Sequence, residues 1–257
     1  MSTLLLIELG ALTLSWPELA TDCLKILRHP ALLLWIPLLL LLSTALHELA
    51  HGLAGRWAGA TVTEIGIAWH FPAVFPYCKV EGADFLTSRR QRAVIVAAGP
   101  CAGLLTMLPA LLLWWWGNEG AFRTVASGLL VAGSFTTAWN LLPLPGLDGY
   151  RILSALLNMT ELAPESRRYR TLLRRRQNRD RATITVKDYP GWAGLVYRNY
   201  PIVAVSTAAV YGYVFSNEAA RAAAELTDIL FSPAIAAIPI GVAAGVMAFL
   251  WAESSVQ

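Results

Sequence analysis

Long apolar stretches separated by short polar segments run through most of the chain. Four of them carry no charged residue and reach the length of about 20 residues that a helix needs to cross a bilayer. A fifth apolar stretch, Ala31 to Ala54, is interrupted only near its end by two histidines and a glutamate. The pattern predicts an all-α polytopic membrane protein with about five to six transmembrane helices. The four uncharged stretches are Ala93 to Asn118, Thr124 to Leu147, Asn199 to Asn217 and Ile229 to Ala252.

The segment between Ala31 to Ala54 and Ala93 to Asn118 follows a different pattern. From Thr61 to Val80, the apolar residues Val62, Ile65 and Ile67 alternate with polar and proline positions. This alternation is typical of extended chain, so we expect a short β-hairpin-like loop between the two core spans. An exposed edge of such a hairpin is suited to pair with another extended strand.

The apolar and polar segments divide the chain into four parts. Residues 1–29 form an N-terminal interfacial or partly membrane-embedded segment, because the apolar run from Leu4 to Trp16 is short and contains Glu8. Residues 30–160 are expected to form a membrane core of three spans, and residues 161–198 a basic segment. The last part, residues 199–257, is a hairpin of two spans.

Composition and charge orient this bundle. Of the 257 residues, 56% are hydrophobic and 14% are charged, whereas soluble domains carry about 25% charged residues. Residues 167–198 contain ten Arg or Lys against two acids, and basic loops stay cytoplasmic, so this segment is predicted to face the cytoplasm of a bacterial inner membrane. Next to a bilayer such a run anchors topology and attracts anionic lipid. We expect no nucleic-acid partner, because no soluble region of domain length is present.

Three ionisable residues interrupt the first span at helical spacing. His47 and His51 are four residues apart, so in a helix they lie on one face, where both can bind one metal ion. Glu48 can then reach a water on that ion, which is the H-E-x-x-H arrangement of zinc peptidases. The same residues would also fit a frayed helix end in the headgroup region. We favour the metal site, because ionisable groups within a span usually mark function.

A catalytic zinc typically has three protein ligands, so a third donor must lie elsewhere in the chain. The other histidines are His29 and His70. Asp148 ends an uncharged run of 24 residues and follows Pro143, Pro145 and Gly146, which would break a helix. Broken backbone within a membrane is tolerated where it lines a cavity. A surface loop with an exposed aspartate is the plain alternative, and we favour Asp148 as the ligand.

The pairing of His-Glu-Leu-Ala-His with the later Asn-x-x-Pro-x-Pro-x-Leu-Asp-Gly resembles the site-2 protease family of intramembrane zinc metalloproteases. The resemblance implies that His47, His51 and Asp148 bind Zn²⁺. It also implies that Glu48 is the catalytic base. Asn140 matches the family asparagine that contacts the substrate or its reacting carbonyl.

A third element extends the resemblance, which covers about residues 30–157. Ala98-Gly99-Pro100 is similar to the family's A-G-P-x-x-N. Gly103 stands where this element usually has asparagine, and Tyr150 stands where many members have a second glycine. Neither position is a metal ligand, so these departures leave the implied chemistry intact.

Together these features predict an intramembrane zinc metalloendopeptidase that hydrolyses a peptide bond through zinc-activated water, with Glu48 as general base. The expected substrate is a membrane-anchored protein or a small peptide, and a regulatory membrane partner is a further expectation. Two other functions fit the same segments. One is a non-catalytic membrane metal-binding or scaffold protein, which would not need Glu48. The other is a transporter, suggested only by the break at Pro143 to Gly146.

Overall fold

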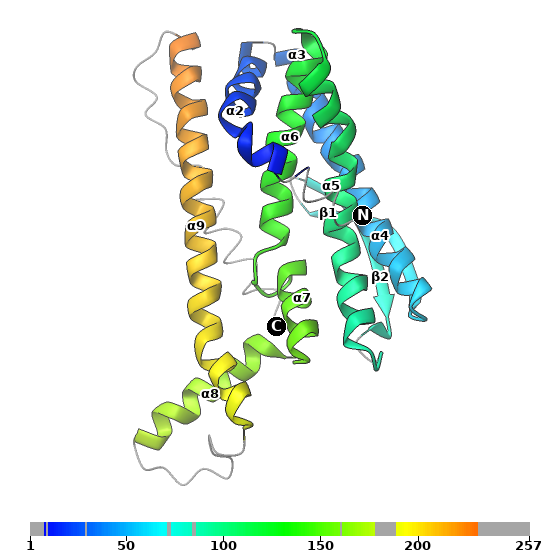
Figure 1. Cartoon of the computed structure of the whole chain (residues 1–257), viewed down its shortest axis with the longest axis vertical. Helices are drawn as coiled ribbons and strands as arrows, with labels where there is room; N and C mark the ends of the chain where they lie inside the picture. Colours follow the sequence, from blue (N-terminus) through cyan, green and yellow to red (C-terminus); the bar gives the residue numbers. More distant parts are fainter. Residues whose placement is uncertain are drawn as a thin grey trace.

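The computed structural model describes residues 8, 10–28, 30–70, 73–83, 86–159, 161–177 and 189–230. Within these ranges the chain is mostly helical, with one two-stranded antiparallel sheet (Figure 1). The predicted span Ile229 to Ala252 lies almost entirely outside them. In chain order the elements are α2 (Trp16–Leu24), the 3₁₀ helix η1 (Lys25–Arg28), α3 (Pro30–Leu33), α4 (Trp35–Trp57), β1 (Thr61–His70), β2 (Ala73–Glu81), α5 (Arg89–Trp116), α6 (Ala121–Asn140), α7 (Asp148–Leu157), α8 (Leu162–Gln177) and α9 (Gly191–Leu230).

Two of the described helical stretches, Ala31–Trp57 and Arg89–Trp116, are long and apolar enough to cross a membrane. They correspond to the first two core spans expected from the sequence, and α4 packs directly against α5. One face of α4 leaves large apolar side chains uncovered, such as Leu42 at 57% and Leu53 at 76% exposure. Such a face suits contact with lipid. A mostly helical protein with apolar spans is therefore confirmed, while the total of five to six spans stays a prediction.

The third predicted span is interrupted before its end. Helix α6 ends at Asn140, residues 141–147 form an irregular loop, and α7 begins at Asp148. Pro143 and Pro145 have no backbone N–H, and Gly146 adopts φ +91°, a conformation that favours glycine. Figure 1 draws α6 and α7 between α9 on one side and the α4–α5 pair on the other.

The expected hairpin is present as β1 and β2. The strands pair from Thr61 opposite Glu81 to His70 opposite Ala73, with an irregularity between Val62 and Glu64. Strand β2 lies against α4, where two glycines leave room for it. An added Cβ on Gly52 would lie 2.6 Å from Cys78 Sγ, and one on Gly55 would lie 2.6 Å from Val80 Cγ1. The sequence of α4 therefore allows the hairpin to approach the helix that carries the two histidines.

The N-terminal helix α2 packs against α6. Leu19 is fully buried there in an apolar cluster with Met107 of α5 and Leu130 of α6. Its Asp22 accepts hydrogen bonds from Trp114 Nε1 at 2.9 Å and Arg123 Nε at 3.1 Å. This polar contact joins α2 to the end of α5 and the start of α6.

Helices α8 and α9 form a separate pair whose shared face is buried. Leu162 and Ala163 at the start of α8 pack with Ala193, Tyr200 and other residues of α9. The opposite face of α8 is basic: Arg167, Arg168, Arg170 and Arg174 are all exposed. The pair contacts α7 through this apolar cluster, which also includes side chains of α7 and of the loop before it.

Candidate metal centre

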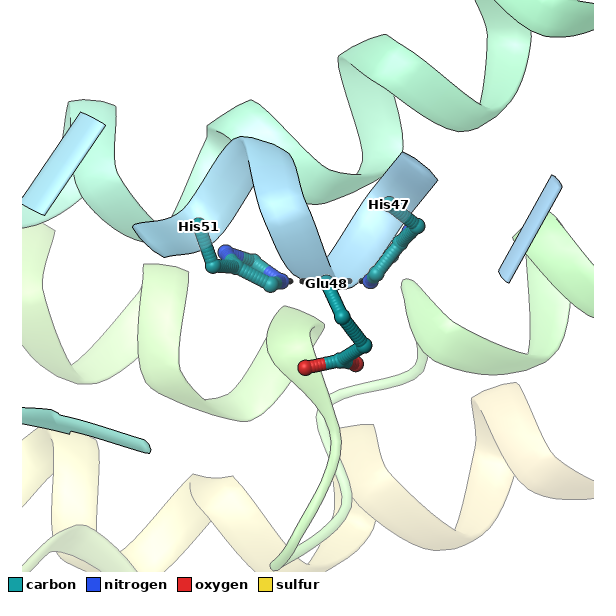
Figure 2. A group of neighbouring side chains, drawn as sticks. All are labelled: His47, Glu48 and His51. Carbon is teal, nitrogen blue, oxygen red and sulfur yellow. Dashed lines mark hydrogen bonds between the residues drawn. The ribbon is translucent and has the colours of Figure 1, made fainter. Parts of the chain in front are cut away.

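Helix α4 places two imidazoles side by side in the protein interior. His47 and His51 are each 8% exposed, and their Nε2 atoms lie 3.1 Å apart (Figure 2). The Nδ1 atom of His51 lies 2.9 Å from the carbonyl oxygen of Ile95 on α5, and only Nδ1–H can donate this bond. The tautomer that donates from Nδ1 leaves Nε2 with a lone pair. The Ile95 carbonyl therefore holds the His51 ring with Nε2 available to a metal ion, as outer partners usually do for ligating histidines.

The broken segment after α6 brings a carboxylate to the same point. Asp148 is 8% exposed, and its Oδ2 lies 2.9 Å from His47 Nε2 and 3.3 Å from His51 Nε2. The three atoms thus form a triangle with sides of 2.9 to 3.3 Å. Ligands at 2.0–2.1 Å in a tetrahedral zinc site stand roughly 3.3 Å from one another. The donor set and its spacing therefore fit a zinc ion.

Glu48 lies beside this triangle without being part of it. A ligand atom of Glu48 lies within 4.8 Å of those of both histidines, so the HExxH residues alone are also a candidate metal group. Its Oε2, however, accepts a hydrogen bond from the backbone N–H of Cys78 at 3.3 Å. Figure 2 shows the carboxylate set apart from the line that joins the two imidazoles. The Asp148 oxygen, by contrast, is close to both Nε2 atoms, so its position is the one that fits a third donor.

Gly99 of α5 makes room for the two imidazoles. An added Cβ at this position would lie 2.2 Å from His51 Nε2 and 2.6 Å from His47 Nε2. Such distances are far inside van der Waals contact, so no other residue fits here without moving the histidines. The same test at Gly103 gives 3.7 Å to His47 Nδ1 and to Thr137 Oγ1, which is ordinary contact. The Ala-Gly-Pro element thus has a steric reason at its glycine, which the sequence alone did not reveal.

A pocket of about 700 Å³ lies over these groups, lined by parts of α4, β2, α5 and α7. Asn140, at the end of α6, is one of its lining residues, together with the metal-site residues. Burial, followed by the nearby Glu48 carboxylate, raises the pKa of the Cys78 thiol. Cys78 therefore stays protonated at neutral pH, which argues against thiolate catalysis in this pocket.

The structure thus brings together all five residues singled out in the sequence: His47, Glu48, His51, Asn140 and Asp148. His29 lies outside the described residues, as does the side chain of His70. Sequence reasoning missed the two backbone groups that hold the site, the Ile95 carbonyl and the Cys78 amide. No side-chain pattern marks them, because any residue supplies these atoms.

Two comparisons with known proteins found a match for this chain. Residues 35–127 match the family described as peptidase family M50. A protein named as a peptide zinc metalloprotease, YydH of Bacillus subtilis (strain 168), is 28% identical over 131 residues. The matched segment makes up 50% of this chain and 50% of YydH, so the chain spans about half the length of that relative. No solved structure matches the chain. Both matches are to peptidases, and Zn²⁺ is the metal that they and the histidine pair point to.

Proposed function

We propose that this chain, whose resemblance to the site-2 protease family is confirmed by its match to peptidase family M50, is an intramembrane zinc metalloendopeptidase. It hydrolyses a peptide bond of a membrane-associated protein or peptide. The observation that carries the proposal is the convergence of His47 Nε2, His51 Nε2 and Asp148 Oδ2 within 3.3 Å of one another in the interior of an apolar helical protein. Buried ionisable groups in such surroundings are costly, so their presence usually marks a functional site.

In this site His47, His51 and Asp148 hold the metal. Zinc, when bound, lowers the pKa of water from about 16 toward 7 and polarises a carbonyl group. Glu48 accepts the proton of the attacking water and then donates it to the leaving amine, as a general base and acid. Its hydrogen bond from the Cys78 amide leaves the second carboxylate oxygen available for this transfer. A positioned base of this kind contributes about 100-fold to 10,000-fold to a rate.

Asn140 is our first choice for the group that contacts the substrate carbonyl. It ends α6 and lines the same pocket as Glu48 and Asp148. Its amide N–H₂ can donate to the oxygen on which negative charge develops during attack. Arg151, which also lines the pocket, is the second choice for this role.

Strand β2 is suited to present the substrate. Cys78 lies opposite Ile65 in the hairpin, and its N–H donates to Glu48 of α4. The free edge of β2 is therefore turned toward the site. An extended substrate segment that pairs with this edge would pass in front of Glu48. Extension is required, because the backbone of a helical substrate shields its peptide bonds.

The proposal includes the topology expected from the sequence. The chain crosses a bacterial inner membrane with about five to six helices, and the basic segment 167–198 faces the cytoplasm. The exposed arginines of α8 support this orientation, because basic segments stay on that side and contact anionic lipid. The proposed parts remain residues 1–29, 30–160, 161–198 and 199–257, and a regulatory membrane partner and a membrane-anchored protein or small-peptide substrate complete the proposal.

Two matched substitutions test the function. The purified parent, Glu48→Gln and Asp148→Asn are each mixed with detergent-solubilised bacterial membrane proteins, and new peptide termini are quantified by mass spectrometry. Zinc per chain is measured by atomic emission on the same samples. Glu48→Gln is expected to keep its zinc and to lose cleavage by at least about 100-fold. Asp148→Asn is expected to lose both.

Each result identifies a different error. Equal cleavage by the parent and Glu48→Gln would show that the base is misassigned. Full zinc occupancy in Asp148→Asn would exclude that residue as the third ligand. Zinc binding by the parent without any new termini would favour the non-catalytic scaffold over the protease.

A further inference from the structure

Helix α9 reaches the loop that carries the third ligand. Tyr200 of α9 is 7% exposed, and its hydroxyl donates a hydrogen bond of 3.0 Å to the carbonyl oxygen of Pro143. Pro143 lies in the loop of residues 141–147, immediately before Asp148. Leu144 of the same loop packs against the apolar cluster to which Tyr200 belongs. The loop is thus fastened to a helix that supplies none of the proposed ligands.

A second tyrosine fastens α7 itself. Tyr150 follows Asp148 by two residues, and its ring centroid lies 6.1 Å from that of Tyr200. Its hydroxyl oxygen accepts the backbone N–H of Ala163 at 3.0 Å, at the start of α8. This N–H has no acceptor within its own helix, because it lies in the first turn. Tyr150 therefore joins the helix of the third ligand to the α8–α9 pair.

The loop has few internal bonds with which to hold its own shape. Pro143 and Pro145 cannot donate backbone hydrogen bonds. Leu147 N–H donates to the Leu144 carbonyl within the loop at 3.1 Å, while the Leu141 and Leu142 amides donate back to α6, to the Thr137 and Trp139 carbonyls at 3.1 and 3.0 Å. External anchors are therefore expected to decide where Asp148 lies relative to the imidazoles.

From these contacts we infer that Tyr200 and Tyr150 are positioning residues for the metal ligand Asp148. Together they hold the loop and the first turn of α7 against α8 and α9, so that the zinc affinity depends on hydroxyl groups outside the ligand set. The inference rests on the proposed function only in taking Asp148 as a ligand. Tyr150 is also one of the two positions at which the sequence departs from the family pattern, which gives that departure a structural role.

The test measures metal binding and needs no substrate. Full-length protein in detergent is depleted of metal, and Zn²⁺ is titrated in competition with a chromophoric chelator. Tyr200→Phe removes one hydroxyl and keeps the ring, and Tyr150→Phe does the same for the bond from Ala163. Each is expected to weaken zinc binding by about tenfold, the lower end of the effect of outer-shell partners. Visible spectra of the Co²⁺-loaded variants report whether the coordination geometry changes at the same time.

Tyr211→Phe is the matched control. Tyr211 lies on the same helix, and its hydroxyl donates at 3.2 Å to the carbonyl of Phe135, which lies in α6 and not in the loop before Asp148. It is expected to bind zinc as the parent does. Thermal unfolding of the metal-free variants is recorded alongside, and Tyr200→Phe is expected to unfold within a few degrees of Tyr211→Phe.

The outcomes separate this inference from the function on which it rests. A zinc affinity of Tyr200→Phe within twofold of the parent would overturn the positioning role, as would an equal loss in Tyr211→Phe. Parental affinity in Asp148→Asn would instead remove the ligand assignment, and the proposed function with it. The result that supports the inference is weaker zinc binding by Asp148→Asn, Tyr200→Phe and Tyr150→Phe, together with parental binding by Tyr211→Phe.

Discussion

Replacing Gly99 with alanine should close the metal site with a single methyl group. The new Cβ would lie 2.2 Å from His51 Nε2 and 2.6 Å from His47 Nε2. A carbon and a nitrogen that are not bonded normally stay about 3.5 Å apart or more. One or both imidazoles would therefore have to move by about 1 Å, whereas zinc sites tolerate deviations of only about 0.2 Å.

The expected size of the effect follows from this displacement. Disturbing an outer partner of a zinc ligand costs about 10-fold to 100-fold in metal affinity, and Gly99→Ala displaces the ligands themselves. We therefore expect zinc binding to weaken by at least about 100-fold, or about 2.7 kcal/mol. Helix α5 does not suffer from the change, since alanine is a better helix former than glycine by about 1 kcal/mol. The loss should thus appear in metal binding and not in folding.

Zinc per chain and the affinity in competition with a chelator measure this effect. Gly103→Ala is the control, because it makes the same change one turn further along α5, where the added Cβ would meet its neighbours at 3.7 Å. This control should bind zinc as the parent does. Parental zinc affinity in Gly99→Ala would refute the placement of the imidazoles against this helix.

Further predictions concern removal of the metal and the contacts of Asp22 on α2. Treatment with 1,10-phenanthroline should abolish cleavage and added Zn²⁺ should restore it; cleavage that survives complete metal depletion would contradict the proposed chemistry. Asp22→Ala should lower the free energy of unfolding by about 1–3 kcal/mol, because it leaves Trp114 Nε1 without its acceptor and Arg123 without its ion pair. Its zinc affinity should not change, and a loss of zinc in this variant would show that the contacts of Asp22 and the metal site are coupled.

The site was predictable where its signals are local in sequence. His47, Glu48 and His51 lie within two turns of one helix, so their spacing alone places them on neighbouring faces. The carboxylate was predictable for another reason: Pro143, Pro145 and Gly146 mark a helix break, and the loop indeed ends at Asp148. Their meeting point is a tertiary fact, for which the helix break favoured Asp148 and the family resemblance implied the same residue.

Helix boundaries were less accessible, because hydrophobicity does not set them. The span expected from Ala93 begins as a helix at Arg89, where the Ser88 side chain accepts the Gln91 amide in the first turn. Helix α9 runs past the expected end at Asn217 as far as Leu230. Just after Asn217, Glu218 and Arg221 form an ion pair of 2.9 Å along the helix. Charged residues therefore continue the helix outside the apolar stretch.

Strand β2 is joined by a hydrogen bond to Glu48, the proposed base, which has a consequence for inhibitor chemistry. A compound with a zinc-binding group and an extended backbone would meet the metal and the strand edge together. The thiol of Cys78 lies at that junction, in the same pocket as Glu48. Because this thiol stays protonated at neutral pH, such a compound would have to gain its affinity from the metal and the strand edge, and not from a covalent bond to Cys78.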